Sequence, residues 1–161
     1  MNVATAFAAQ WLVVVPALLV VTAIVVRRNW KWDLIEAFVA GLAAVALVKI
    51  AGTFFVEPRP FVAEHVQPLV AHAADNAFPS DHLAACGLAF MYLLVRSRAM
   101  AAAVLLLAGA IAYARVAAHL HWPLDVAVGF VLGMLAALLA RFSVQRLAGK
   151  ASEGPASHRR P

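Results

Sequence analysis

The sequence predicts an all-α integral membrane protein: one helical bundle of about five transmembrane helices, with a sixth conceivable, and with the N-terminus outside. Of its 161 residues, 65% are hydrophobic and 13% are charged, and the mean hydropathy is +0.86. Soluble domains average about 45–50% apolar and about 25% charged residues. The basic residues gather at the ends of long apolar runs rather than on one face, which is a membrane topology signal and argues against nucleic acid as a partner.

The first apolar run covers residues 3–26, which is long enough to cross a bilayer at about 1.5 Å per residue. A cleaved signal peptide is the alternative interpretation of such a run. No basic residue precedes it, whereas Arg27, Arg28 and Lys31 follow it. This charge pattern favours a retained transmembrane helix.

The second span is expected from about residue 33 to residue 56. Asp33 and Glu36 stand near its start, where acidic side chains favour a helix N-terminus. Two prolines in Glu57-Pro58-Arg59-Pro60 deny the helix backbone donors and end it. Residues 61–77 are mixed and fairly polar, and we expect a loop there with at most a short interfacial helix.

Three further spans are expected at residues 83–95, 99–113 and 123–140. The first of them is short and ends at Arg96 and Arg98, whose long side chains can snorkel to the lipid headgroups. Gly129 and Gly133 form a small-xxx-small pattern, which we expect to allow tight packing inside the bundle rather than a dimer seam. The one cysteine, Cys86, lies in an apolar run and is expected in the core.

Residues 1–142 are expected to form one transmembrane domain, and residues 143–161 a basic, disordered cytoplasmic tail. With five spans, ten of the 13 lysines and arginines share one face: Arg27, Arg28, Lys31, Arg96, Arg98, Arg141, Arg146, Lys150, Arg159 and Arg160. The positive-inside rule makes that face cytoplasmic and places the N-terminus outside. The polar stretches at residues 59–82 and 115–125 then lie on the outer face. The oligomeric state stays open.

The polar stretches contain the groups that an anion with several oxygens requires. Arg59 and Arg115 offer forked donors that match phosphate oxygens. Ser80 stands where the third span should begin, as a natural N-cap, and a helix N-terminus is a ready anion site. Ionisable residues in so apolar a chain are retained mainly for function.

Two histidines supply reactive groups, because one can attack phosphorus while the other protonates the leaving oxygen. Asp125 follows His121 by four residues and can orient its ring, so His121 is the expected nucleophile and His82 the expected acid. A metal site of His82, His119 and His121 is a further option, but neighbouring arginines would repel a cation. The other histidines are expected to be loop or interfacial residues: His65, His72 and His119.

At these residues the sequence resembles the type-2 phosphatidic-acid phosphatase superfamily, which includes the vanadium haloperoxidases. The family signatures are Lys-x6-Arg-Pro, Pro-Ser-Gly-His and Ser-Arg-x5-His-x3-Asp. Here the second reads Pro79-Ser80-Asp81-His82 and the third reads Ala114-Arg115-x5-His121-x3-Asp125. The matches cover residues 59–125 in the family's order.

Three departures stand out. The family's lysine would fall at Gly52, whereas Lys49 lies one helical turn deeper. Ala114 replaces a serine and Asp81 replaces a glycine. With Arg59-Pro60-Phe61, these variants resemble the family's bacterial undecaprenyl-diphosphatase branch.

The resemblance implies that His121 forms a phosphohistidine, that Asp125 orients it and that His82 protonates the leaving group. The implied phosphate ligands are Arg59, Ser80 and Arg115. Lys49 is a further candidate phosphate ligand, and Asp81 a candidate to position Arg115 or a water. No metal and no other cofactor is implied.

The expected function is hydrolysis of a lipid diphosphate, undecaprenyl diphosphate to the monophosphate, on the extracytoplasmic side of a bacterial inner (plasma) membrane. A phosphatase for phosphatidate, phosphatidylglycerol phosphate or another lipid monophosphate is the second interpretation. An anion transporter or channel would need polar residues across the membrane, and among the spans only Lys49 qualifies. A non-catalytic lipid-binding scaffold is a third class, against which His82, His121 and Asp125 argue.

Overall fold

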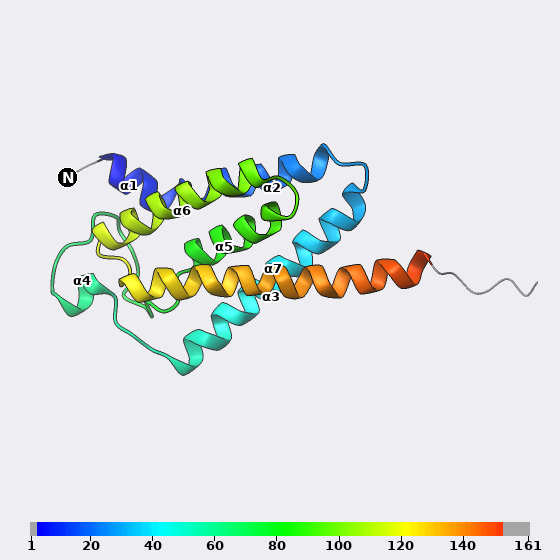
Figure 1. The fold of residues 1–161 in the computed structure, drawn as a ribbon. Helices are drawn as coiled ribbons and strands as arrows, with labels where there is room; N and C mark the ends of the chain where they lie inside the picture. The colour runs from blue at the N-terminus through cyan, green and yellow to red at the C-terminus, as the bar shows by residue number, and fades with distance from the viewer. Residues whose placement is uncertain (1–2, 153–161) are drawn as a thin grey trace, which may run out of the picture.

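The computed structural model describes residues 3–152, and this part of the chain is an all-α bundle (Figure 1). Its helices are α1 (Val3–Gln10), α2 (Val14–Val25), α3 (Trp30–Phe54), α4 (Pro60–Ala63), α5 (Asp81–Leu94), α6 (Arg98–Ala117) and α7 (Pro123–Ser152). Three of them, α3, α6 and α7, are long and apolar enough to cross a membrane, and α1 with α2 would form a fourth, bent span. α5 is apolar but has only 14 residues. The expected fold class of about five spans is confirmed.

The first expected span is broken: α1 and α2 meet at a bend of 45°. Pro16, the third residue of α2, has no N–H to give to the Leu12 carbonyl, so the helix cannot run straight through residues 11–13. The Val14 N–H donates instead to the Trp11 carbonyl at 3.1 Å. The break leaves the last carbonyls of α1 available to groups from other helices.

α5 lies at the centre of the bundle and packs against α2, α3, α6 and α7. Its approach to α7 is closest at glycines. A Cβ on Gly87 would lie 1.9 Å from the Phe130 carbonyl oxygen, and one on Gly133 would lie 1.9 Å from the Ala84 carbonyl oxygen. Gly129 packs in the same way on the backbone of Ser80. The expected tight packing at the glycine pattern, inside the bundle, is confirmed.

A buried ion-pair cluster lies at the end of the bundle where α5 ends and α3 begins. Arg96 Nη2 lies 2.8 Å from Asp33 Oδ1 and 2.9 Å from Glu36 Oε2, and its guanidinium stacks 3.6 Å from the Tyr92 ring centroid. The snorkelling expected of Arg96 is therefore wrong, because its side chain is only 4% exposed. Asp33 and Glu36 act as buried partners of this arginine rather than as simple helix-terminal charges.

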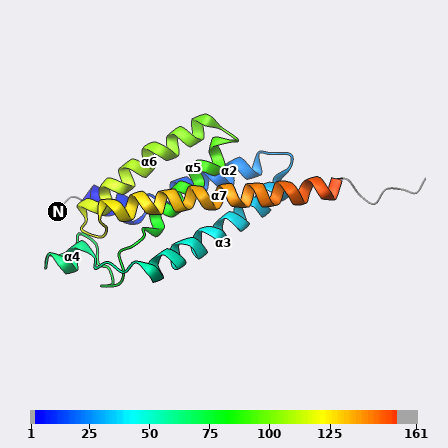
Figure 2. The ribbon, with the colours of Figure 1, turned by 60° about the horizontal axis from the view of Figure 1, so that its bottom comes forward.

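α7 is longer than expected. It continues to Ser152, and its last turns project beyond the other helices (Figure 2). Disorder was expected from residue 143, and this is wrong for residues 143–152, whose arginine, glutamine, leucine and alanine side chains favour helix. Residues 153–161 of the expected tail lie outside the described residues.

Candidate active site

A polar cavity of about 380 Å³ opens at the end of the bundle where α3 and α6 end and α5 and α7 begin. Its lining includes six of the eight residues singled out from the sequence: Lys49, Arg59, Asp81, His82, Arg115 and His121. The other two, Ser80 and Asp125, are fully buried, and the Ser80 N–H donates to the Asp125 carbonyl at 3.1 Å. The structure thus gathers residues far apart in the sequence into one site.

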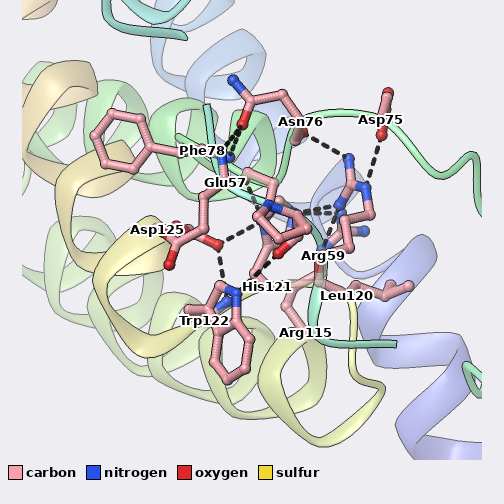
Figure 3. A network of polar contacts seen from close by, with 12 residues as sticks. Glu57, Arg59, Asp75, Asn76, Phe78, Arg115, Leu120, His121, Trp122 and Asp125 are labelled. Carbon is pink, nitrogen blue, oxygen red and sulfur yellow. Dashed lines mark hydrogen bonds and ion pairs between the residues drawn. The ribbon is translucent and has the colours of Figure 1, made fainter. Parts of the chain in front are cut away.

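His121 lies in the short loop between α6 and α7, and its two ring nitrogens face different partners (Figure 3). Nε2 is 2.7 Å from Arg115 Nη2 and 3.5 Å from Arg59 Nη1. A guanidinium only donates, so Nε2 accepts, and Nδ1 carries the proton that it donates to the Ala77 carbonyl at 2.8 Å. The unprotonated nitrogen is therefore the one held among the cationic donors.

The charge state of His121 follows from the same surroundings. Burial lowers the pKa of His121, the Arg115 and Arg59 guanidiniums lower it further, and Asp125 and the Ala77 carbonyl oppose them. The net shift is downward. The ring is thus kept neutral at ordinary pH, which is the form that can act as a nucleophile.

Asp125 lies beside His121 but is not its nearest acceptor. Its Oδ2 is 3.6 Å from His121 Nδ1 and accepts the Trp122 N–H at 2.8 Å, so it also secures the first turn of α7. The shorter bond to Ala77 is the one that fixes the imidazole. A buried carboxylate at this distance can still stabilise positive charge on the imidazole ring.

Protein groups orient both arginines. Arg59 Nε donates to Asp75 Oδ1 at 2.7 Å, and Arg59 Nη1 donates to the Leu120 carbonyl at 2.8 Å. Arg115 Nη1 donates to the carbonyl of Ala9 at 3.0 Å; Ala9 lies in the last turn of α1, just before the break between α1 and α2. Burial is the largest single effect and raises the pKa of the Asp75 carboxyl, but the hydrogen bond from Arg59, the charge of Arg59 and smaller contributions together outweigh burial, so the pKa is lowered.

Asn76 folds the loop that reaches over the site. Its Oδ1 accepts the backbone N–H groups of Glu57 at 2.9 Å and Phe78 at 3.0 Å, and its Nδ2 donates to the Gly52 carbonyl at 3.0 Å (Figure 3). The loop thereby presents the carbonyl of Ala77 to His121. Sequence reasoning missed Asp75, Asn76 and the backbone carbonyls, because none of them belongs to a recognisable motif.

Three buried side-chain atoms in the described part of the chain have no hydrogen-bond partner, and all three belong to this site: Ser80 Oγ, Arg115 Nε and Asp125 Oδ1. Buried polar atoms are normally paired. Ser80 occupies the N-cap position of α5 as expected, but its hydroxyl makes no capping bond. Ser80 Oγ and Arg115 Nε are donors that an anion with several oxygens could satisfy.

The remaining polar candidates divide between cavity and surface. His82 contacts the backbone of Gln10. Asp81 is exposed at the cavity edge and forms no hydrogen bond to Arg115 in the described residues, so its expected positioning of that arginine is not supported. His119 instead pairs with Glu64 at 3.1 Å.

No group of three metal-binding side chains gathers within residues 3–152, which argues against the three-histidine metal alternative.

Comparison with known proteins adds independent evidence. The BcrC protein of Bacillus licheniformis, a "Bacitracin transport permease protein", is 35% identical over 115 residues, which cover 70% of this chain and 56% of the relative. The "Undecaprenyl-diphosphatase BcrC" of Bacillus subtilis (strain 168) is 32% identical over 108 residues, covering 66% and 56%. This chain thus spans about half the length of these relatives. Escherichia coli (strain K12) YbjG is 31% identical over 157 residues, covering 92% and 76%.

Solved structures show the same fold. LpxE of Aquifex aeolicus superposes with a TM-score of 0.67 at 26% identity, covering 84% of this chain and 80% of that one. A transmembrane PAP2-type phosphatidylglycerolphosphate phosphatase of Bacillus subtilis gives a TM-score of 0.61 at 20% identity, covering 96% and 76%. The sequence model of the PAP2 superfamily matches residues 38–148, which include the whole cavity lining. This protein therefore belongs to the PAP2 superfamily.

Proposed function

We propose that this protein hydrolyses a polyisoprenoid lipid diphosphate, undecaprenyl diphosphate to the monophosphate, through a phosphohistidine at His121. The observation that carries the proposal is the unprotonated Nε2 of His121, held beside Arg59 and Arg115 in a polar cavity of an otherwise apolar bundle. Membership of the PAP2 superfamily and the diphosphatase name of a Bacillus subtilis relative support it.

In the first step, His121 Nε2 attacks the terminal phosphorus and the bond from that phosphorus to the bridging oxygen breaks. The lipid monophosphate leaves, and His82 can protonate its departing oxygen. Arg59, Arg115 and the Ser80 hydroxyl would hold the oxygens of the transferred phosphoryl group and stabilise its charge. Water then attacks the phosphorus of the phosphohistidine, inorganic phosphate leaves, and the neutral imidazole returns.

The site is proposed to face the extracytoplasmic side of a bacterial inner membrane. It lies at one end of the bundle, and the turn from α2 to α3, the turn from α5 to α6 and the projecting end of α7 lie at the other (Figure 1). Those segments hold most of the lysines and arginines, which are retained on the cytoplasmic side. Carrier lipid released on the outer side would return to cell-wall synthesis.

The decisive experiment is phosphate release by the detergent-purified protein in EDTA, with undecaprenyl diphosphate, phosphatidate and phosphatidylglycerol phosphate compared at equal surface concentration. We expect the diphosphate to give the highest kcat/KM. Preference for either monophosphate would keep the chemistry and move the substrate to the glycerolipids. Failure to release phosphate from all three would contradict a phosphatase and favour a lipid-binding scaffold.

The break between α1 and α2 leads to a second expected result. Pro16→Ala restores an N–H for the Leu12 carbonyl and removes the ring that obstructs a continuous helix, so α1 and α2 can join; the Ala9 carbonyl would then accept the Val13 N–H and Arg115 would lose an acceptor. We expect kcat/KM to fall about 10-fold or more, because hydrogen bonds to charged groups are worth about 1.5–3 kcal/mol.

Hydrogen exchange at the Val13 and Val14 amides provides the structural measurement for Pro16→Ala, since both amides should become more protected when the helix closes. Leu18→Ala, on the exposed face of α2, is the matched control and should change neither quantity. Greater protection at these amides with undiminished activity would show that the Ala9 carbonyl does not position Arg115.

A further inference from the structure

Lys49 lies where two cavities meet. The polar cavity that holds His121 shares Lys49, Val48 and Asp81 with an apolar groove of about 400 Å³ between α3 and α5. The rest of the groove lining is small or apolar: Gly41, Ala44, Val45, Ala84, Ala85 and Leu88. A substrate with its terminal phosphate at His121 and its chain in this groove would place the group that joins them beside Lys49.

We propose that Lys49 binds the lipid-proximal phosphate of a diphosphate substrate and thereby selects diphosphates over monophosphates. The inference rests on the proposed function and deepens it. The terminal phosphate already has its ligands, because Arg59 and Arg115 are the guanidiniums that contact the nucleophilic nitrogen of His121. Lys49 is not part of that set, and it has no ion-pair partner among the described residues.

The structure explains why the cation stands at position 49 and not one turn later. A Cβ on Gly52 would lie 3.1 Å from the Phe78 carbonyl oxygen, and the Gly52 carbonyl accepts Asn76 Nδ2 at 3.0 Å. A lysine at position 52 would therefore press on the backbone of the loop that orients His121. Placing the cation at Lys49, about one turn deeper in α3, keeps the loop in place and brings the charge to the mouth of the groove.

The charges at this junction require a cation for a second phosphate. Asp81 also lines both cavities, and its carboxylate would repel a phosphate at their border. Lys49 is the one basic side chain of the groove lining, and an unneutralised phosphate beside apolar walls is costly. When the bridging bond breaks, negative charge grows on the proximal phosphate as it leaves, so Lys49 stabilises the transition state as well as the bound substrate.

A lipid monophosphate makes a different demand. Its departing oxygen is an alkoxide attached to the lipid chain, which requires a proton from an acid such as His82 rather than a fixed cation. It carries no second phosphate for Lys49 to bind. The ratio of kcat/KM for the diphosphate to kcat/KM for the monophosphate therefore measures how much Lys49 contributes by binding the second phosphate.

The test compares undecaprenyl diphosphate with undecaprenyl monophosphate for the purified wild type and for Lys49→Met, Lys49→Arg and Thr53→Val. We expect Lys49→Met to lower the ratio about 10- to 100-fold, as for the loss of one charge-assisted hydrogen bond. Lys49→Arg should recover most of the ratio. Thr53→Val is the matched control, because Thr53 lines the polar cavity but not the groove, and it should keep the wild-type ratio.

The outcomes separate this inference from the proposed function. If Lys49→Met lowers kcat/KM for both lipids by the same factor, Lys49 binds the terminal phosphate and the inference is overturned while the diphosphatase activity stands. An unaltered ratio with unaltered rates overturns it too. If the wild type does not hydrolyse the diphosphate, the proposed function itself fails, whatever the variants do.

Discussion

His121→Ala is expected to reduce phosphate release from the lipid diphosphate by about a thousandfold or more, because it removes the atom that attacks phosphorus. Wild-type protein quenched during turnover with substrate labelled in the terminal phosphate should carry an acid-labile, alkali-stable phosphoryl group. His121→Ala should carry none. The fold should persist, since the Nδ1 contact to Ala77 is one of several that hold the loop.

His119→Asn is the matched control for this loss. His119 is two residues away, pairs with Glu64 on the outside and does not line the cavity. Its backbone φ is 57°, in the left-handed region that asparagine tolerates, so the substitution does not strain the loop. Near-normal activity in His121→Ala, or equal loss in His119→Asn, would contradict the assignment of the nucleophile.

The sequence was sufficient to predict which residues gather at the site, because these residues are polar in an apolar chain. Arg59, Arg115 and His121 stand at ends of apolar runs, and motif spacing relates them to one another. The structure places them within hydrogen-bonding distance. Their catalytic roles stay predictions until variants are assayed.

What the sequence did not reveal are the groups that orient those residues. The carbonyls of Ala9, Ala77 and Leu120 hold Arg115, His121 and Arg59 respectively, and a backbone carbonyl leaves no trace in residue identity. The Ala9 carbonyl is available because of the helix break near Pro16, the Ala77 carbonyl belongs to the loop fixed by Asn76, and the Leu120 carbonyl belongs to the loop between α6 and α7. Only the proline was a visible signal.

The burial of Arg96 was unpredictable for a related reason. A basic residue at a helix end is compatible both with snorkelling and with an internal ion pair. The choice depends on Asp33 and Glu36, about 60 residues away in sequence. Local pattern gives the position of the charge, and tertiary packing decides its partner.

Gly133→Ala is expected to destabilise the protein, although replacing a helical glycine by alanine usually stabilises a helix by about 0.5–1 kcal/mol. Here the new Cβ would lie 1.9 Å from the Ala84 carbonyl oxygen and 2.7 Å from the Leu88 nitrogen, so α5 and α7 must separate. Overpacking of this kind costs about 1–3 kcal/mol and occasionally more. The midpoint of unfolding in an SDS titration from mild detergent measures the change.

Gly109→Ala is the control and should raise the midpoint of unfolding rather than lower it, because a Cβ on Gly109 meets nothing within 4 Å. If both variants unfold at the same midpoint, α5 and α7 are not in backbone contact at Gly133.

A separation of these two helices would also affect the site, since the same helix pair joins Ser80 to Asp125 through a backbone hydrogen bond of 3.1 Å. A separation of α5 from α7 would disturb this bond and shift Ser80 relative to Asp125, so Gly133→Ala should lose activity before it loses its fold.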